Sequence, residues 1–406
     1  MRIGVVCFDS ATNLSVGDKT FASLDSGWAS VAGEGAKRIS MVQELPSDTL
    51  WITNLTETQF FGAKLHAHPN FRSEAYMRST LRHLYSELGV DPAHVSLDKV
   101  TRVLATVAQR VIDYAETRLG VYPRSKTLNE DFALAMKAPA SHVPEDMHDV
   151  LRESAEHAYV RTLQSNTHMN GGKPLTLRRN RLLHARDLLS RPVPQDVRWE
   201  HIPAAALPRG EGAIERMLDQ SESAFLVDAE VSNVNPHVAE VFSIGGGARS
   251  IRRWLTDVEW RMAREWADIR YNGVLISCEP SIAVPQRHCL PTGDYAPLSI
   301  TCSLVAEQVW TAMTIKRGGR DEPRYTAAAA WIRAFDRMAM FDYAQRLYAL
   351  GLSIWGYGGG NVVVQYPEGG LKHTLDLVTD TGLLAPASKL LEAGRPQVTE
   401  GVYGTA

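Results

Sequence analysis

The segment between residues 325 and 367 constrains the fold of this chain more than any other. Residues 325–350 have the apolar, Ala-rich composition of a helix and run into Gly351, a residue that commonly ends helices. The stretch LSIWGYGGGNVVVQYP follows at 352–367, with β-branched and aromatic residues on both sides of three consecutive glycines. This order predicts a helix and then a β-hairpin that turns on Gly358, Gly359 and Gly360. The chain must therefore combine helices with sheet.

Further strands and helices extend this combination over the whole sequence. Compact apolar runs predict strands at residues 3–9 (IGVVCFD), 50–54 (LWITN), 224–228 (AFLVD) and 272–278 (NGVLISC). Apolar residues three and four positions apart predict helices within residues 74–119, at 250–269 and at 299–313. The expected fold class is α/β (α+β).

The length of 406 residues indicates two or three domains, at roughly 100–200 residues per domain. We expect an N-terminal α/β domain at 1–120 and a C-terminal α+β domain at 209–406. Residues 121–208 form the segment between them, where TLRRNRLLHARDLLSR at 176–191 predicts a basic helix. The prolines from Pro192 to Pro208 then suggest a linker.

Composition limits where the protein works. With 44% hydrophobic and 22% charged residues, it is an ordinary globular chain. The first apolar run, residues 3–8, is interrupted by Asp9 before it could form a signal-peptide core, and no stretch reaches the roughly 20 apolar residues of a membrane span. The four cysteines form no CxxC pair, which suits a reducing compartment. We therefore expect a cytoplasmic protein without a membrane partner.

The charge is unevenly distributed although the net value is only -3. Residues 157–186 contain no Asp or Glu, while six cations lie there: Arg161, Lys173, Arg178, Arg179, Arg181 and Arg186. Such a region could follow a nucleic-acid backbone, because each neutralised phosphate adds salt-dependent affinity. The basic turn with Lys316, Arg317 and Arg320 could contribute as well. The alternative, of equal weight, is that these cations pair with acids of other elements, including the run at 145–156.

Two short patterns could bind a metal ion. Asp228 and Glu230 follow a strand two positions apart, so both carboxylates could reach one Mg²⁺ or Mn²⁺ ion. His66 and His68 share that spacing and could bind zinc or iron. A solvated strand end and a surface loop, respectively, are the favoured explanations, so the sequence predicts no certain cofactor.

Two glycine-rich loops could bind an anion through their backbone N–H groups. In GYGGGN at 356–361, the β-branched residues that follow favour a hairpin turn instead. In SIGGGARS at 243–250, Gly245, Gly246 and Gly247 lead toward a predicted helix beside Arg249, which suits an anion site. A flexible entry into that helix explains the second loop equally well.

Taken together, the order of elements after residue 220 resembles the palm of family B DNA polymerases. The likeness lies in a strand that ends at Asp228, a helix, a long insertion, a second helix and the hairpin of LYALGLSIWGYGGGNVVVQYP. In that family, the hairpin has the sequence Tyr-Gly-Asp-Thr-Asp-Ser, whereas this chain has Gly359, Gly360 and Asn361 in place of Asp-Thr-Asp. Only Asp228 carries over, so the resemblance implies a palm-like, non-catalytic relative that binds nucleic acid or a polymerase partner.

The leading hypothesis is a nucleic-acid-associated, non-catalytic protein, of a phage or plasmid replication or packaging system. The first alternative is a metal-dependent phosphoryl-transfer enzyme that uses Asp228 and Glu230. The second is a structural, self-assembling protein such as a virion component, since nine tryptophans would suit subunit packing.

Overall fold

The computed structural model describes residues 1–9, 26–77, 81–136, 145–162, 172–195, 197–244, 253–291, 299–316 and 324–395. Its combination of helices and sheets confirms the α/β (α+β) class. The chain groups into two compact units: unit 1 comprises residues 1–136, 289–312 and 386–406, and unit 2 comprises residues 137–288 and 313–385. Both units are discontinuous, in contrast to the three consecutive segments suggested by the sequence, whose boundaries stay a prediction.

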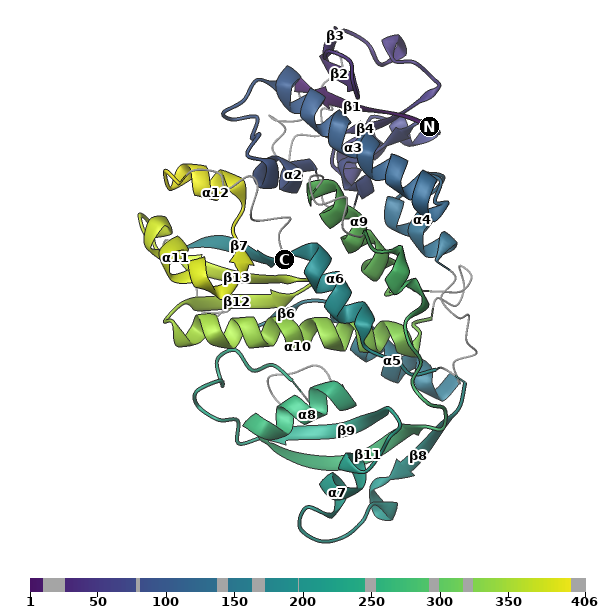
Figure 1. The fold of residues 1–406 in the computed structure, drawn as a ribbon, viewed down its shortest axis with the longest axis vertical. Helices are drawn as coiled ribbons and strands as arrows, with labels where there is room; N and C mark the ends of the chain where they lie inside the picture. Colours follow the sequence, from purple (N-terminus) through teal and green to yellow (C-terminus); the bar gives the residue numbers. More distant parts are fainter. Residues whose placement is uncertain are drawn as a thin grey trace. The chain divides into compact units, whose positions relative to one another are not determined.

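Unit 1 is built on a five-stranded mixed sheet with the order β3-β2-β1-β4-β5 (Figure 1). The strands are β1 (Arg2–Phe8), β2 (Gly27–Val31), β3 (Lys37–Ile39), β4 (Thr49–Thr53) and β5 (Phe71–Arg72). β1 runs antiparallel to β2 and parallel to β4. The strands predicted at 3–9 and 50–54 are confirmed as β1 and β4.

The helices of unit 1 are α1 (Glu57–Gly62), α2 (Leu81–Leu88), α3 (Leu97–Leu119), α4 (Leu128–Ala135), α9 (Ser299–Ala312) and α12 (Ala387–Glu392). α3 packs against β1 and β2, and α9 packs against α3 and α4. The apolar face of α3 includes Val100, Leu104 and Val111, all fully buried or nearly so, as the spacing of apolar residues predicts.

Unit 2 contains two antiparallel sheets, with the orders β14-β7-β13-β12-β6 and β10-β9-β11-β8. The first contains β6 (Val160–Arg161), β7 (Lys173–Arg179), β12 (Ser353–Gly358), β13 (Asn361–Tyr366) and β14 (Leu383–Leu384). The second contains β8 (Trp199–Pro203), β9 (Phe225–Ser232), β10 (Trp254–Thr256) and β11 (Asp268–Ser277). β12 and β13 pair antiparallel around Gly359 and Gly360, which confirms the predicted hairpin.

The helices of unit 2 are α5 (His148–Glu156), α6 (Arg181–Ser190), α7 (Ala213–Asp219), α8 (Asp257–Trp266), α10 (Ala327–Ala349) and α11 (Leu371–Val378). α10 is the central helix: it packs against β12 and β13 of one sheet, and against α5, α6 and α8 (Figure 1). Because it is covered on several sides, α10 buries polar residues as well as apolar ones, among them Arg333, Asp336 and Arg337.

Three predictions about local structure are wrong. The basic helix predicted at 176–191 begins only at Arg181, because residues 173–179 alternate buried and exposed side chains and pair with β13 as β7. In the helix predicted at 250–269, residues 254–256 pair with β9 as β10, and Thr256 then caps α8. The predicted Pro-rich linker contains β8, which pairs with β11.

Within the described ranges, no helix is both long enough and apolar enough to cross a membrane.

Candidate nucleic-acid interface

The end of β7 carries two arginines of the predicted basic region. Its register with β13 places Arg178 opposite Asn361, and Arg178 Nε donates a hydrogen bond of 2.8 Å to Asn361 Oδ1. The next residue, Arg179, donates its backbone N–H to Gly360 O at 3.0 Å. The hairpin turn of β12 and β13 therefore fixes the backbone from which both arginines project.

A single residue, Asn180, connects β7 to α6. Its Oδ1 accepts hydrogen bonds from the backbone N–H groups of Leu182 and Leu183, at 3.0 and 3.1 Å. This is the usual geometry of an Asn helix cap, and it turns the chain sharply from strand into helix. The basic residues of the strand end and those of α6 are thereby brought to one corner of unit 2.

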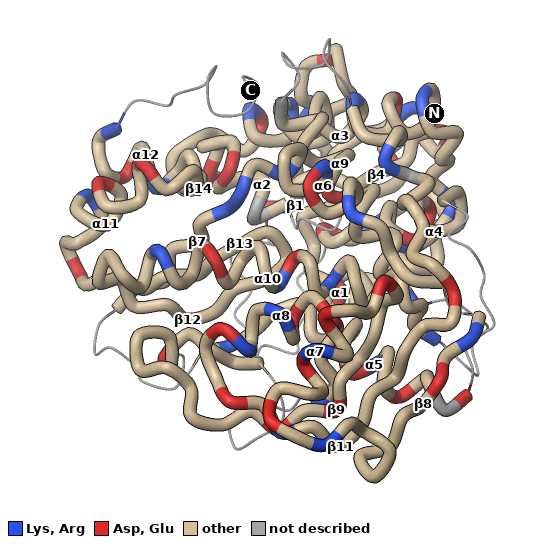
Figure 2. Tube along the Cα trace, turned by 60° about the horizontal axis from the view of Figure 1, so that its bottom comes forward, with Lys and Arg blue, Asp and Glu red and all other residues tan. Residues whose placement is uncertain are grey.

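We use the name basic corner for Arg178, Arg179, Arg186 and Arg191. Figure 2 shows basic positions along β7 in blue. Arg186 is exposed and the side chain of Arg191 is 41% exposed, whereas that of Arg179 is 22% exposed. Arg191 immediately follows α6 and was not among the residues predicted from the sequence.

The carboxylate of Asp187 lies between two of these arginines. Asp187 Oδ2 accepts a hydrogen bond of 2.8 Å from Arg179 Nη1, and its Oδ1 lies 3.4 Å from Arg191 Nη2. Burial raises the pKa of Asp187, but the hydrogen bond from Arg179 and the charges of Arg191 and Arg179 outweigh burial and leave the pKa below its ordinary value. Asp187 therefore stays ionised and pairs with two of the four arginines.

Two aromatic rings support the arginines that contact Asp187. The guanidinium of Arg179 lies 6.0 Å from the ring centroid of Tyr343, and that of Arg191 lies 5.1 Å from that of Phe335. Both rings come from α10, so the helix holds the two guanidinium groups over its surface by cation–π contact.

Beneath the basic corner lies a buried carboxylate, Asp336 of α10. It accepts hydrogen bonds from the N–H groups of Gly359 at 2.6 Å and Gly360 at 2.8 Å. Its third partner is His184 of α6, whose Nε2 lies 2.8 Å from Asp336 Oδ1. The amide groups of the glycine turn therefore bind an anion of the protein itself, which agrees with a hairpin turn.

The hydrogen bonds of His184 indicate its tautomer. Arg179 Nη1 lies 3.3 Å from His184 Nδ1, and a guanidinium can only donate. Nδ1 therefore accepts, and Nε2 carries the proton that is donated to Asp336. Burial raises the pKa of Asp336, but the hydrogen bond from His184, the charge of Arg333 and the N–H of Gly359 outweigh burial and leave the pKa below its ordinary value.

The other predicted nucleic-acid-binding residues do not gather at this corner. Lys173 begins β7 opposite Tyr366 and lies 3.7 Å from Glu368, five residues and about 17 Å along the strand from Arg178. Arg181 is only 6% exposed, so its side chain points into unit 2. Lys316 Nζ pairs with Glu156 Oε1 at 2.9 Å, while Arg317 and Arg320 lie outside the described residues.

The acidic run at 145–156 has partners away from the basic corner. Glu153 Oε1 accepts the backbone N–H of Trp254 at 3.0 Å, and Glu156 binds Lys316 as described. Asp149 lies 3.0 Å from Arg152 of the same helix. Three acids that could have paired with the basic region thus have other partners.

Asp228 and Glu230 each lie beside an arginine. Arg253 donates from Nε and Nη2 to the two carboxylate oxygens of Asp228, whose side chain is 7% exposed. Glu230 Oε2 lies 3.5 Å from Arg270 Nη1, and its side chain is 54% exposed. Asp228 and Glu230, the predicted ligands of a metal ion, thus lie on one face of β9, but the first carboxylate is buried and the second is exposed.

His66 lies in a short 3-10 helix (Leu65–Ala67), and His68 follows it. The ring centroid of His66 is 4.9 Å from that of Phe61, and that of His68 is 6.1 Å from that of Phe71. Among the residues that the structure describes, no group of three or more His, Cys, Asp or Glu could hold a metal ion. The predicted anion loop of Gly245, Gly246, Gly247 and Arg249 falls outside those residues.

The sequence analysis missed the buried charges that organise unit 2. Besides Asp336, α10 buries Arg337, which binds Glu259 Oε1 at 2.8 Å and donates to the carbonyl oxygens of Ser154 and His157 at 2.7 and 2.8 Å. Their signal in the sequence is the pair Asp336-Arg337 within an otherwise apolar, Ala-rich helix. Such residues are buried only when they are paired.

Comparison with known proteins gives no family. No protein-family model and no curated protein matches the chain. Phi29 DNA polymerase complexed with primer-template DNA is a similar solved structure, with 11% identity and a TM-score of 0.48 over 89% of this chain and 80% of that chain. The same polymerase complexed with single-stranded DNA gives 10% identity and a TM-score of 0.48 over the same shares. TM-scores this low do not establish a common fold, so the palm-like resemblance stays a prediction.

Proposed function

We propose that this protein binds nucleic acid through the basic corner and performs no chemistry there. The observation that supports the proposal is that β7 and α6, joined by Asn180, bring Arg179 and Arg191 to one carboxylate, that of Asp187, while Arg178 and Arg186 lie on the same two elements. An excess of cations at one exposed place is the usual electrostatic footprint of a nucleic-acid-binding surface.

The chemistry of the corner suits phosphate groups. A guanidinium presents its N–H donors as a planar fork that matches phosphate oxygens, and it keeps its charge at any physiological pH. The carboxylate of Asp187 is held by Arg179 and Arg191, and His184 is buried against Asp336. The remaining groups are carboxamide and aromatic side chains, which bind or stack but do not act as nucleophile or base at neutral pH. Binding should be insensitive to sequence, since backbone contacts carry no base information.

The buried network below the corner would keep its arginines in place. Arg179 is connected to Asp336 through His184, and Asp336 in turn holds the glycine turn. Because these groups are fixed before a ligand arrives, less side-chain entropy is lost on binding.

The experiment compares two double variants with the same formal net charge. Arg186→Glu/Arg191→Glu reverses two exposed cations of the basic corner, and Arg209→Glu/Arg287→Glu reverses two exposed cations elsewhere in unit 2. Fluorescence anisotropy with single-stranded DNA and RNA oligonucleotides should be recorded over a series of salt concentrations. Both variants should first show native circular dichroism and cooperative unfolding.

The wild type should lose affinity steeply with salt. The corner variant should bind at least about tenfold more weakly, and the slope of log affinity against log salt should fall by about 1.4–1.8, the value for two lost phosphate contacts. The matched control should keep a slope near that of the wild type. Equal slopes and affinities in both variants would remove the basis of the proposal.

A further inference from the structure

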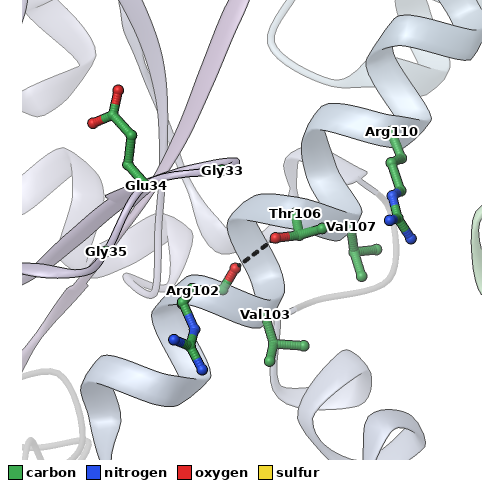
Figure 3. Close-up of a pocket in the computed structure, with 8 residues that line it drawn as sticks. All are labelled: Gly33, Glu34, Gly35, Arg102, Val103, Thr106, Val107 and Arg110. Atoms are coloured by element: carbon green, nitrogen blue, oxygen red, sulfur yellow. Dashed lines mark hydrogen bonds between the residues drawn. The ribbon is translucent and has the colours of Figure 1, made fainter.

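A groove in unit 1 is formed by residues that are distant in the sequence from those of the basic corner. Its volume is about 460 Å³, and it is lined by Gly33, Glu34, Gly35, Arg102, Val103, Thr106, Val107 and Arg110. Figure 3 shows Arg102, Val103, Val107 and Arg110 projecting from α3, with the glycine turn between β2 and β3 beside them. This volume lies within the range of sites for small molecules, about 300–1,000 Å³.

Two cations of the groove, Arg102 and Arg110, have no partner among the residues that the structure describes. In the part of the chain that the structure describes, the guanidinium groups of Arg102 and Arg110 make neither a hydrogen bond nor an ion pair. They are eight residues apart on one helix, so their Cα atoms are separated by about 12 Å along its axis. An anion with more than one charged group could contact both.

The turn that contains Gly33 and Gly35 adds backbone N–H donors without adding side chains. The backbone N–H groups of Gly33 and Gly35 have no hydrogen bond among the described residues, and a Cβ atom built on either glycine would meet nothing within 4 Å. Gly33 has φ of +81°, a conformation that a glycine adopts at little cost. Free N–H groups of this kind bind anions in many turns.

The one carboxylate of the groove is already neutralised. Glu34 is ion-paired with Arg2, which begins β1. The groove therefore keeps the charge of Arg102 and Arg110, while Val103 and Val107 give it an apolar part.

From these observations we infer that the groove binds a small organic polyphosphate. Arg102 and Arg110 would bind the phosphate groups, and Val103 and Val107 would contact the organic part. This site is independent of the basic corner: its residues belong to unit 1 and those of the corner to unit 2.

Isothermal titration calorimetry with ATP, inorganic tripolyphosphate and adenosine tests the inference on the full chain. ATP should bind most tightly, tripolyphosphate more weakly and adenosine not measurably. Equal affinities of ATP and tripolyphosphate would contradict the contact with the valines, and equal affinities of ATP and adenosine would contradict the role of the arginines. No heat of binding with either phosphate compound would overturn the site.

Variants assign the binding to the groove. Arg102→Gln/Arg110→Gln should weaken ATP binding by about tenfold or more, since each substitution removes a charged hydrogen-bond donor. Arg124→Gln/Lys126→Gln, which removes two exposed cations of unit 1 outside the groove, should leave it within about twofold. Glu34→Gln should tighten binding, because it frees Arg2 and removes a negative charge.

Two outcomes separate this site from the basic corner. Arg186→Glu/Arg191→Glu should bind ATP as the wild type does, and Arg102→Gln/Arg110→Gln should retain salt-sensitive binding of oligonucleotides. Unchanged ATP affinity in the groove variant, with native circular dichroism, would overturn the inference and leave the proposed function untouched.

Discussion

His184 Nε2 and Asp336 Oδ1 lie 2.8 Å apart, and both side chains are at most 2% exposed. This contact joins α6 to α10, and the same carboxylate accepts the N–H groups of Gly359 and Gly360 in the hairpin turn. One buried acid thus fixes two helices and a turn relative to one another. The geometry of the basic corner, which begins where β7 meets that turn, depends on it.

The substitution Asp336→Asn should strongly destabilise unit 2. An Asn side chain offers one acceptor oxygen where the carboxylate offers two, so at least one buried N–H donor loses its partner. Breaking a buried charged contact typically costs about 3–5 kcal/mol, and we expect a loss near the lower limit because Asn keeps the shape. Urea denaturation followed by circular dichroism measures it.

Asp342→Asn on the same helix is the matched control. Its carboxylate is 63% exposed and lies 3.2 Å from Arg346 Nη2. An exposed i,i+4 pair contributes only about 0.3–0.5 kcal/mol, so this variant should unfold almost as the wild type does. If both variants lost the same free energy, the network around Asp336 would have no special role in stability.

The close approach of the glycine turn to His184 can be tested by substituting two glycines with nearly equal φ. Gly360 and Gly369 have φ of +74° and +75°, but a Cβ atom on Gly360 would lie 3.2 Å from His184 Cδ2, whereas one on Gly369 would meet nothing within 4 Å. Gly369→Ala should cost about 1–2 kcal/mol for the left-handed conformation alone. Gly360→Ala should cost more, because His184 must also move.

Thermal unfolding of the two variants gives the comparison. Gly360→Ala should additionally weaken oligonucleotide binding, since a displaced His184 no longer supports Arg179. Equal destabilisation by the two substitutions would show that the contact with His184 is unimportant. Loss of binding in Gly369→Ala as well would mean that the effect is one of general stability.

The sequence predicted correctly those elements whose conformation depends on residues close together in the chain. The hairpin followed from β-branched runs around glycines, and β1 from an unbroken apolar run. In β7 the local signal was misleading: the residues from Arg178 to Arg186 favour a helix, yet Leu175 and Leu177 are buried as alternate residues of a strand. Pairing with β13, almost two hundred residues away, decides the conformation there.

The buried network could not be derived from the sequence for the same reason. His184 and Asp336 are separated by 152 positions, and nothing in either local pattern points to the other. The metal hypothesis for Asp228 and Glu230 also depended on local spacing. Arg253 lies 25 positions beyond Asp228 in the sequence, and it binds the carboxylate of Asp228 because β10 pairs with β9.

Asp257 should make stability depend on pH with the opposite sign to most acids. Burial raises its pKa from 3.8 to about 6, although the hydrogen bond from Trp331 Nε1 and the charge of Arg261 oppose the shift. The folded state then binds more protons than the unfolded state between these values, so this group's contribution to stability falls as pH rises through that interval.

The variant Asp257→Asn isolates this contribution. Asn keeps an oxygen that can accept from Trp331 and does not titrate. Relative to the wild type, the variant should gain about 2 kcal/mol in free energy of unfolding between about pH 4.5 and about pH 7.5. Urea denaturation at both pH values provides the measurement, with Asp342→Asn as an exposed control. A difference between variant and wild type that stays constant with pH would rule out the raised pKa.

The metal hypothesis gives a prediction that depends on Arg253. In the wild type, both carboxylate oxygens of Asp228 accept from that guanidinium, so Mn²⁺ should not bind there. Arg253→Ala should free the carboxylate of Asp228, on the same strand face as Glu230, and create a weak Mn²⁺ site. Adding Asp228→Asn to that variant should abolish it.

Electron paramagnetic resonance of free Mn²⁺ measures the binding in all three proteins. The exposed pair of Glu230 and Arg270 serves as the control: Arg270→Ala leaves Asp228 engaged and should not create a site, because one exposed carboxylate holds Mn²⁺ too weakly. Binding by the wild type that disappears in Asp228→Asn would instead mean that Arg253 yields to the metal. In that case phosphoryl-transfer chemistry would be expected at Asp228 and Glu230, within β9, and not at the basic corner.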